Sequence, residues 1–404
     1  MEETIGVKRP WWRSLGPGLI TAALVFGPGS LTVMSKLGAI YGYELLWVLI
    51  GTTVLMMAFT AMSARIGLVS SISLLQLFRN KWGKAVALFT GVAIFFVTAS
   101  FQAGNTIGAG IAFAESFQTS TAPWIVFISL LAIGLLFFRS FYRILEKVMM
   151  LMVALMLVSF VFTVILAKPS LANLVQGLIP SVPQGSLLLV IAMVASSFSV
   201  AGAFYQAYLV QEKGWKRSEM KLATNEGLSG ILVLGVISGM ILISAASILY
   251  PQGIQVVAAG DMGKSLEPLY GNFATAIFML GLFGASFSSL VGNATIGGTL
   301  FADAMSLGRD LNSFSVKVLI TAVIVIGAGV ALIFGKLPLE LIIFAQGITI
   351  FAVPFIGFGI LLIANDSEIM GKDTNKKRHN IPGVIGLLVL LLLAGSNFYS
   401  LFLS

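Results

Sequence analysis

LVFGPGSLTV, residues 24–33, interrupts the first long apolar segment of the chain. Pro28 removes a backbone hydrogen-bond donor, and Gly27 and Gly29 are among the poorest helix formers, so a helix is expected to break here. Because lipid cannot satisfy free backbone N–H and C=O groups, such a break must face protein or a water-filled cavity. The stretch therefore predicts a binding site inside a membrane span, and a simple proline kink is the alternative.

The composition is that of a polytopic membrane protein. Of 404 residues, 58% are apolar and 10% are charged, and the mean hydropathy is +1.00. Apolar runs of about 20 residues, the length that crosses a bilayer, recur along the chain. They predict one all-α transmembrane domain over 1–404 with eleven spans, at about 15–38, 43–66, 85–116, 121–138, 143–168, 186–211, 225–250, 271–306, 315–335, 339–364 and 382–403.

The net charge of +8 reflects membrane topology rather than nucleic-acid binding. With eleven spans, most basic residues fall in loops on one side, so the positive-inside rule places the N-terminus in the cytoplasm and the C-terminus outside, in the cell membrane. We interpret the first apolar run as a retained span and not as a signal peptide. The basic loop residues are Lys8, Arg9, Arg13, Arg79, Lys81, Lys84, Arg139, Arg143, Lys147, Lys213, Lys216, Arg217, Lys221, Arg309, Lys317, Lys372, Lys376, Lys377 and Arg378.

Enzyme chemistry finds no support in the sequence. There is no cysteine, the one histidine, His379, falls in a predicted hydrophilic loop, and no catalytic motif or carboxylate pair lies in a span. We therefore predict no enzymatic activity and no cofactor. Lys36, at the outer end of the first span, is interpreted as a lysine that reaches to the interface, with attraction of a substrate as the alternative.

A second interruption, Ser199-Val-Ala-Gly-Ala203, falls in the sixth predicted span, five spans after the first. Two interrupted helices in corresponding positions of two halves are typical of an inverted-repeat transporter that binds its substrate at the breaks. We expect repeats at about 15–168 and 186–364, with 382–403 as an extra helix. Small residues in the sixth span are also typical of helix packing, so that interruption is the weaker of the two.

Several stretches resemble the NRAMP family of divalent-metal transporters over nearly the whole chain. The resemblance implies a LeuT-type fold with eleven helices, of which the first ten form two inverted repeats and helices 1 and 6 are broken. The matching stretches are Gly16-Pro17, Pro28-Gly29, LGAIYGYELLWVLI (37–50), SARIGLVS (63–70), IGAGIAF (107–113), FYRILEKVMMLMV (141–153), YLVQ (208–211), GASFSS (284–289) and VPFIGFGILLIANDSEIMG (353–371).

The chain departs from the family where the family binds its ion. By the resemblance, Gly27 and Ser30 replace the outer members of an Asp-Pro-Gly-Asn motif, and Ser199-Val-Ala-Gly202 replaces Met-Pro-His-Asn. A second family histidine falls on Gln206, and a glutamine of helix 10 falls on Ala352. The acidic pair of helix 3, associated with protons, falls on Gln102 and Asn105.

Each of these changes is from an ionisable or metal-binding group to a neutral one. Divalent cations prefer hard oxygen ligands, usually carboxylates, but Mg²⁺ can remain largely hydrated in a polar pocket. We therefore expect any metal transport to proceed without proton coupling, and leave the metal ligands unassigned. The predicted substrate-binding residues are Gly27, Pro28, Gly29, Ser30, Asn105, Ser196, Ser199, Ala201 and Gly202, and the predicted pathway residues are Gln102, Gln206 and Asn293.

Three functions remain open at this point. The first is transport of a divalent cation, such as hydrated Mg²⁺ or Mn²⁺. The second is transport of a small amino or carboxylic acid, held at the positive N-terminal ends of the half-helices. The third is a receptor on a transporter scaffold that no longer transports. The hydroxyls and amide of SFSSLVGNAT, residues 286–295, fit a coupling-ion site, a vestibule lining or simple helix packing.

Overall fold

The computed structural model describes residues 26–137, 139–335 and 338–403, and these residues form helices and connections without a β-strand. Predicted span 1 is therefore seen only from Phe26 onward, and positions 15–25 lie outside the described residues. The longer helices are α2 (Pro28–Tyr41), α3 (Leu46–Val69), α5 (Lys84–Phe117), α6 (Thr121–Leu135), α7 (Arg139–Ala167), α9 (Leu187–Ser197), α10 (Val200–Glu212), α11 (Met220–Ile248), α14 (Ala274–Ala304), α15 (Phe314–Phe334), α16 (Pro338–Ile348), α17 (Val353–Ala364) and α19 (Lys377–Phe402).

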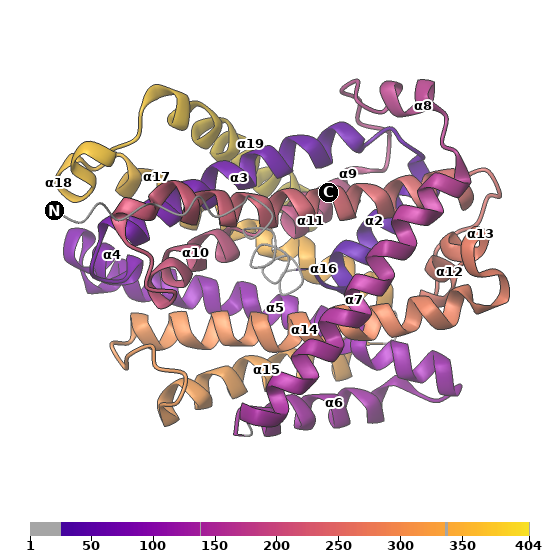
Figure 1. The fold of residues 1–404 in the computed structure, drawn as a ribbon, viewed down its shortest axis with the longest axis horizontal. Helices are drawn as coiled ribbons and strands as arrows, with labels where there is room; N and C mark the ends of the chain where they lie inside the picture. The colour runs from indigo at the N-terminus through magenta and orange to yellow at the C-terminus, as the bar shows by residue number, and fades with distance from the viewer. Residues whose placement is uncertain (1–25, 138, 336–337, 404) are drawn as a thin grey trace, which may run out of the picture.

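Short helices gather at the two ends of the long ones. Figure 1 shows α8, α12 and α13 at one end of the bundle and α4 and α18 at the other, as expected if the loops alternate between two membrane faces. The short helices are α4 (Leu74–Trp82), α8 (Leu171–Gln176), α12 (Ala259–Gly263), α13 (Glu267–Tyr270) and α18 (Ser367–Met370), with 3₁₀ turns at Arg217–Glu219, Lys264–Leu266, Gly271–Phe273, Thr349–Phe351 and Gly371–Asp373.

Seven helical segments among the described residues are long and apolar enough to cross a membrane, or eight if a bent pair counts as one span. The helix α6 and the apolar part of α7 are shorter than that length. The multi-pass architecture is thus confirmed, whereas the number eleven remains a prediction.

The span predicted at about 339–364 is bent in the structure. The helical segments Leu339–Phe351 and Val353–Ala364 meet at an angle of 43°. Pro354 lies in the first turn of α17 and cannot donate a backbone hydrogen bond to the preceding turn, so the helix bends at Ala352. A third interruption therefore exists beside the two that the sequence predicted.

The break in the sixth span is shorter than expected. Only Phe198 and Ser199 separate α9 from α10, so Ala201 and Gly202 are helical and the prediction of unwinding over 199–203 was wrong at its C-terminal end. The Ser199 hydroxyl accepts a hydrogen bond from the Gly202 N–H at 3.3 Å and caps α10. A serine cap fixes where a helix starts, whereas Ala and Gly do not by themselves force unwinding.

The break in the first span also lies earlier than expected. Gly27 is extended, with φ −130° and ψ −178°, and α2 begins at Pro28, so Pro28, Gly29 and Ser30 are helical and not unwound. Proline suits the first helical position because the N–H that it lacks would have no partner there. Of the residues before this break, the structure describes Phe26 alone.

The C-terminal helix starts earlier than predicted as well. It begins at Lys377 rather than at 382, and His379 lies in its first turn, not in a loop. The backbone N–H of Lys376 donates to His379 Nδ1 at 3.2 Å, and this cap allows the helix to begin among polar residues. Pro382 lies inside the helix, near its start.

Small residues let the central helices approach closely. A Cβ atom on Gly38 would overlap the backbone oxygen of Leu242 in α11, and one on Gly67 would overlap that of Ala207 in α10. Such close backbone approach is the usual basis of helix association in lipid, where apolar burial alone gives little preference. The helices α5 and α14 pack side by side through the middle of the bundle (Figure 1).

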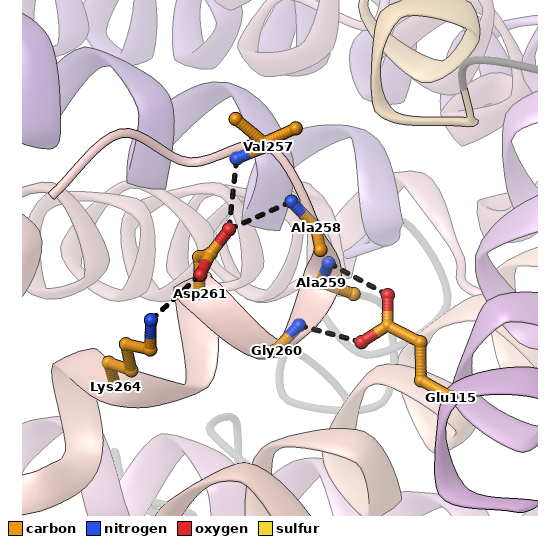
Figure 2. Close-up of polar contacts among 7 residues, drawn as sticks. All are labelled: Glu115, Val257, Ala258, Ala259, Gly260, Asp261 and Lys264. Atoms are coloured by element: carbon orange, nitrogen blue, oxygen red, sulfur yellow. Dashed lines mark hydrogen bonds and ion pairs between the residues drawn. The ribbon is translucent and has the colours of Figure 1, made fainter. Parts of the chain in front are cut away.

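A carboxylate clamp fastens α12 to the end of α5. Figure 2 shows Glu115 accepting the N–H groups of Ala259 and Gly260, at 3.0 and 2.8 Å, while Asp261 accepts that of Ala258 at 2.9 Å. Asp261 also pairs with Lys264, at 2.9 Å. Because α12 packs on α14 and contacts α2 and α5, these hydrogen bonds hold α12 against the helices at one end of the bundle.

Candidate functional site

A small cavity lies where the starts of α2 and α10 face each other across the bundle. Its volume, taken as the space open to the centre of a water molecule, is about 50 Å³. Helices α2, α5, α9, α10, α14 and α16 form its wall. The lining residues are Gly27, Gly29, Ser30, Phe101, Asn105, Ser196, Ser199, Ala201, Gly202, Ser289, Asn293, Ile296 and Gln346.

Most of the predicted site residues meet in this cavity. From the two interrupted helices it collects Gly27, Gly29, Ser30, Ser196, Ser199, Ala201 and Gly202, and from elsewhere Asn105 and Asn293. The sequence could predict this meeting because both interruptions leave backbone groups that must be satisfied inside protein or water.

The positive ends of two helices border the cavity. Gly27 caps α2 without a side-chain hydrogen bond, so the N–H groups of the first turn of α2 have no side-chain acceptor at that cap. The first turn of α10, with Ala201 and Gly202, forms the facing wall. Partial positive charge at helix N-termini favours anions or the oxygens of water molecules.

The opposite wall, from α5 and α14, presents amides and hydroxyls. The Ser289 hydroxyl donates to the Phe26 carbonyl oxygen at 2.8 Å, and the Asn293 amide donates to the Thr98 carbonyl oxygen at 2.6 Å. Asn105 is buried, and its Oδ1 lies 3.1 Å from the position that a Cβ on Gly27 would take. Two neutral side-chain oxygen atoms therefore lie close to Gly27.

Gln346 is a site residue that the sequence analysis missed. It projects from α16 into the cavity, and a Cβ on Gly29 would overlap its amide. The resemblance had placed the glutamine of helix 10 on Ala352, but Ala352 lines a separate apolar groove of about 770 Å³ between α5, α15 and α16. The signal was present, because Gln346 is an isolated amide in an apolar span.

Three predicted residues lie outside the cavity lining. The Pro28 ring packs against α5, where a Cβ on Gly108 would be 2.6 Å from its own Cβ. Gln102 is fully buried and packs on Gly327 of α15, and Gln206 packs on Gly227 of α11. A separation of three residues leaves Gln102 and Asn105 about 60° apart around α5, enough for them to face different neighbours.

Among the described residues, the cavity lining contains no charged residue and no histidine. Across the described residues, no group of three or more His, Cys, Asp or Glu side chains is placed to hold a metal ion. The lining therefore offers hydroxyl, amide and carbonyl oxygens alone, which can bind a hydrated or monovalent cation but give a bare divalent ion little compensation for lost water.

Charged groups instead make structural contacts elsewhere. Lys36 Nζ lies 3.1 Å from Glu340 Oε1, so this lysine is part of an ion pair between α2 and α16. The buried Asp303 carboxylate accepts hydrogen bonds from Tyr208, at 2.7 Å, and from Ser73, at 2.5 Å. These contacts join helices at the ends of the bundle and leave the cavity neutral.

Known proteins match the whole architecture. The divalent metal cation transporter MntH of Chromohalobacter salexigens is 25% identical over 405 residues, which cover 97% of this chain and 91% of that protein. The structure of the Eremococcus coleocola manganese transporter, solved with an aromatic bis-isothiourea substituted compound, matches this chain with a TM-score of 0.81 at 18% identity. The match covers 100% of this chain and 90% of the transporter chain.

A more distant structure shares the same fold. MhsT in complex with L-phenylalanine has a TM-score of 0.62 at 16% identity, with 93% of this chain and 98% of that chain covered. This likeness confirms the LeuT-type fold. The family profile described as natural resistance-associated macrophage protein-like, or Nramp, matches residues 18–400, and the chain therefore belongs to the Nramp family.

Proposed function

We propose that this protein is a multi-pass secondary transporter that moves a divalent metal cation, with part of the water shell of the ion retained. The family supports transport, and MntH of Chromohalobacter salexigens is named for divalent metal cations. The observation that carries the proposal is the cavity at the two helix breaks, because the polar groups among its described lining residues are uncharged.

Retained water follows from the chemistry of the lining. Hydroxyls and amides replace little of the stabilisation that a divalent ion loses on dehydration, whereas a hydrated ion presents water hydrogens to them. A water molecule needs about 10–15 Å³ of cavity, so the cavity of about 50 Å³ has room for a few waters around one small ion. Mg²⁺, which keeps several waters in protein sites, fits best.

Transport without protons is part of the proposal. Asn105, Gln102 and Gln206 carry amides, which do not titrate, and the part of the lining that the structure describes contains no titratable side chain. We further infer a cytoplasmic N-terminus and an extracytoplasmic C-terminus from the basic loops. Repeats at about 15–168 and 186–364, with 382–403 as an extra helix, are consistent with breaks that face each other.

A small amino or carboxylic acid is the second candidate. The specific observation in its favour is that the N-termini of α2 and α10 both border a cavity whose described lining residues include no carboxylate. An anion would be attracted to these ends, and no negatively charged side chain among the described lining residues would repel it.

A ligand panel distinguishes the two candidates. Thermal unfolding of the purified full chain is measured with Mg²⁺, Mn²⁺, Ca²⁺ and a set of small acids, since a ligand that binds the native state raises the melting temperature. We expect Mg²⁺ or Mn²⁺ to stabilise the protein and Gln346→Leu to remove the effect.

Thr295→Val is the matched control, because the Thr295 hydroxyl donates to Val291 O within α14, at 2.8 Å, and Thr295 is not part of the lining. Stabilisation by a small acid and by neither metal would replace the first candidate with the second. A metal effect that survives unchanged in Gln346→Leu would place the ion elsewhere.

A further inference from the structure

The apolar groove between α5, α15 and α16 is far larger than the cavity at the helix breaks. Its volume is about 770 Å³, against about 50 Å³ for that cavity. The buried part of its lining, here called the floor, includes the small residues Ala99, Ala103 and Ala345. The exposed part of its lining, here called the rim, includes Phe96 and Phe334. Small floor residues below large rim residues recess the groove into the bundle.

The hydroxyls of the groove already have acceptors. Ser100 donates to the Ala345 carbonyl oxygen at 2.8 Å, and Thr349 donates to the Gln346 carbonyl oxygen at 2.7 Å. Among the described lining residues the one charged side chain is Glu340, which lies in the first turn of α16. An occupant would therefore meet apolar surface along the groove and a carboxylate at one end of it.

The length of the groove matches one leaflet of a bilayer. Twelve residues separate Glu340 from Ala352, which lines the groove at the bend of the helix. At about 1.5 Å per residue this is about 18 Å, and half of a hydrocarbon core is about 15 Å thick. Because the chain is a multi-pass membrane protein with exposed apolar side chains along this rim, lipid is what covers the groove.

The charges at the end of the groove select a headgroup. Glu340 Oε1 pairs with Lys36 Nζ at 3.1 Å, and 49% of the Glu340 side chain is exposed, so a second cation can reach the carboxylate. A headgroup with both an ammonium and a phosphate complements Glu340 and Lys36 together. Phosphatidylethanolamine carries both groups, whereas the trimethylammonium of phosphatidylcholine donates no N–H and phosphatidylglycerol has no cation.

We propose that this groove binds an acyl chain of one phosphatidylethanolamine molecule, with the headgroup ammonium on Glu340 and the phosphate beside Lys36. Apolar burial gives little preference among surfaces that all face lipid. Selection therefore comes from close packing of the acyl chain in the recessed groove and from the two headgroup contacts.

The lipid would act on the cavity through α16. Phe344 and Ile348 of this helix line the groove, whereas Gln346 lines the cavity. Two residues separate Gln346 from each of them, which places it about 160–200° away around the helix, on the opposite face. A lipid that packs better against one position of α16 shifts the protein toward that position. This effect rests on the proposed function, whereas lipid binding itself does not.

Lipid binding is tested without metal. Thermal unfolding of the purified full chain in detergent micelles is measured against rising mole fractions of phosphatidylethanolamine, phosphatidylcholine or phosphatidylglycerol with identical acyl chains. We expect a saturable rise in melting temperature, at the lowest mole fraction with phosphatidylethanolamine. Val330→Trp fills the groove from α15 and should raise the half-saturating mole fraction by about tenfold or more.

Three further variants make the test specific. Val325→Trp adds the same volume to the same helix, at a 53% exposed position outside the groove lining, and should respond to lipid as the wild type does. Ile326→Trp, at a 40% exposed position of the rim, narrows the groove if Val330→Trp folds poorly. Glu340→Gln leaves Lys36 without its partner, so the preferred lipid should change from phosphatidylethanolamine to phosphatidylglycerol.

A half-saturating mole fraction unchanged in both Val330→Trp and Ile326→Trp would overturn the proposal. An order of headgroup preference that stays the same in Glu340→Gln would overturn it as well. A dimer, detected by light scattering, that Val330→Trp separates into monomers would assign the groove to a second copy of the chain instead of to lipid.

Failure of the proposed metal substrate looks different. In that case the metal panel gives no shift while the lipid response remains. Where metal uptake occurs, wild-type protein should be faster in phosphatidylethanolamine-containing vesicles than in phosphatidylcholine vesicles, and Val330→Trp should be equally fast in both. Equal rates for the wild type in the two kinds of vesicle would overturn the effect of the lipid on α16.

Discussion

Gly27→Asp tests whether the absent carboxylate is what limits divalent-ion affinity in this cavity. The new Cβ would lie 3.0 Å from Ser289 Oγ and 3.1 Å from Asn105 Oδ1, so both neighbours must yield by a few tenths of an ångström. The carboxylate would then lie among neutral oxygens at the start of α2, with no cationic side chain among the described lining residues. Without metal, this is a buried and unpaired charge.

The expected magnitude follows from that burial. An uncompensated buried charge destabilises a protein by about 3–5 kcal/mol. At about 2.1 cal/mol/K of unfolding entropy per residue, a chain of this length loses about 1 °C of melting temperature per kcal/mol, so we expect the charge to lower the melting temperature by about 3–5 °C beyond the steric effect of the new Cβ. Mn²⁺ at about 100 times its Kd should restore about 2.7 kcal/mol, or about 3 °C.

The matched control is Gly27→Asn, which introduces the same Cβ and nearly the same volume without the charge. It should show the steric cost, about 1–3 kcal/mol, and gain no Mn²⁺ response. Adding Ser30→Asn to Gly27→Asp supplies one more oxygen, yet selectivity against Ca²⁺ should stay poor because no thioether is present. The assay is thermal unfolding with and without metal. Wild-type protein that binds Mn²⁺ as tightly as Gly27→Asp would refute the reasoning.

Three further changes test the packing and the contacts at the ends of the bundle. Gly38→Ala should destabilise the protein by about 1–3 kcal/mol because its Cβ overlaps Leu242 O, whereas Gly51→Ala, which meets nothing within 4 Å, should not; equal melting temperatures would contradict the close approach of α2 and α11. Glu115→Ala removes both carboxylate oxygens that accept hydrogen bonds from the start of α12 (Figure 2), so amide hydrogen exchange at 257–261 should accelerate. Unchanged exchange would mean that these hydrogen bonds do not stabilise α12. Tyr208→Phe leaves Asp303 without one donor and should cost about 1–3 kcal/mol in chemical unfolding; a neutral result would show that water replaces the hydroxyl.

Sequence reasoning located the cavity because helix-breaking residues in lipid demand a polar environment. Gly27 and Ser199 mark their breaks directly, and the apolar runs mark the long helices to within a few residues. Hydropathy says little about a bend within an apolar run, so the angle at Ala352 was not predicted although Pro354 was visible.

The direction in which each buried amide side chain points could not be predicted without the packed structure. Asn105 turns toward Gly27 while Gln102, one turn away, turns toward α15, and neither sequence spacing nor polarity separates them. Gln346 was missed because the resemblance directed attention to Ala352. Which of several buried amides meets a cavity depends on how helices rotate against neighbours distant in sequence, and a single sequence does not carry that information.

Uptake into proteoliposomes, with a metal-sensitive dye and a pH-sensitive dye inside the same vesicles, tests the central claim most directly. The account predicts accumulation of Mg²⁺ or Mn²⁺ above that in protein-free vesicles, without acidification of the lumen, because the described residues of the cavity lining include no titratable side chain. The Gln346→Leu protein should accumulate neither metal above the level in protein-free vesicles, and the lumen should not acidify. Acidification that rises in proportion to metal uptake, or uptake of a small acid with no movement of either metal, would contradict the account.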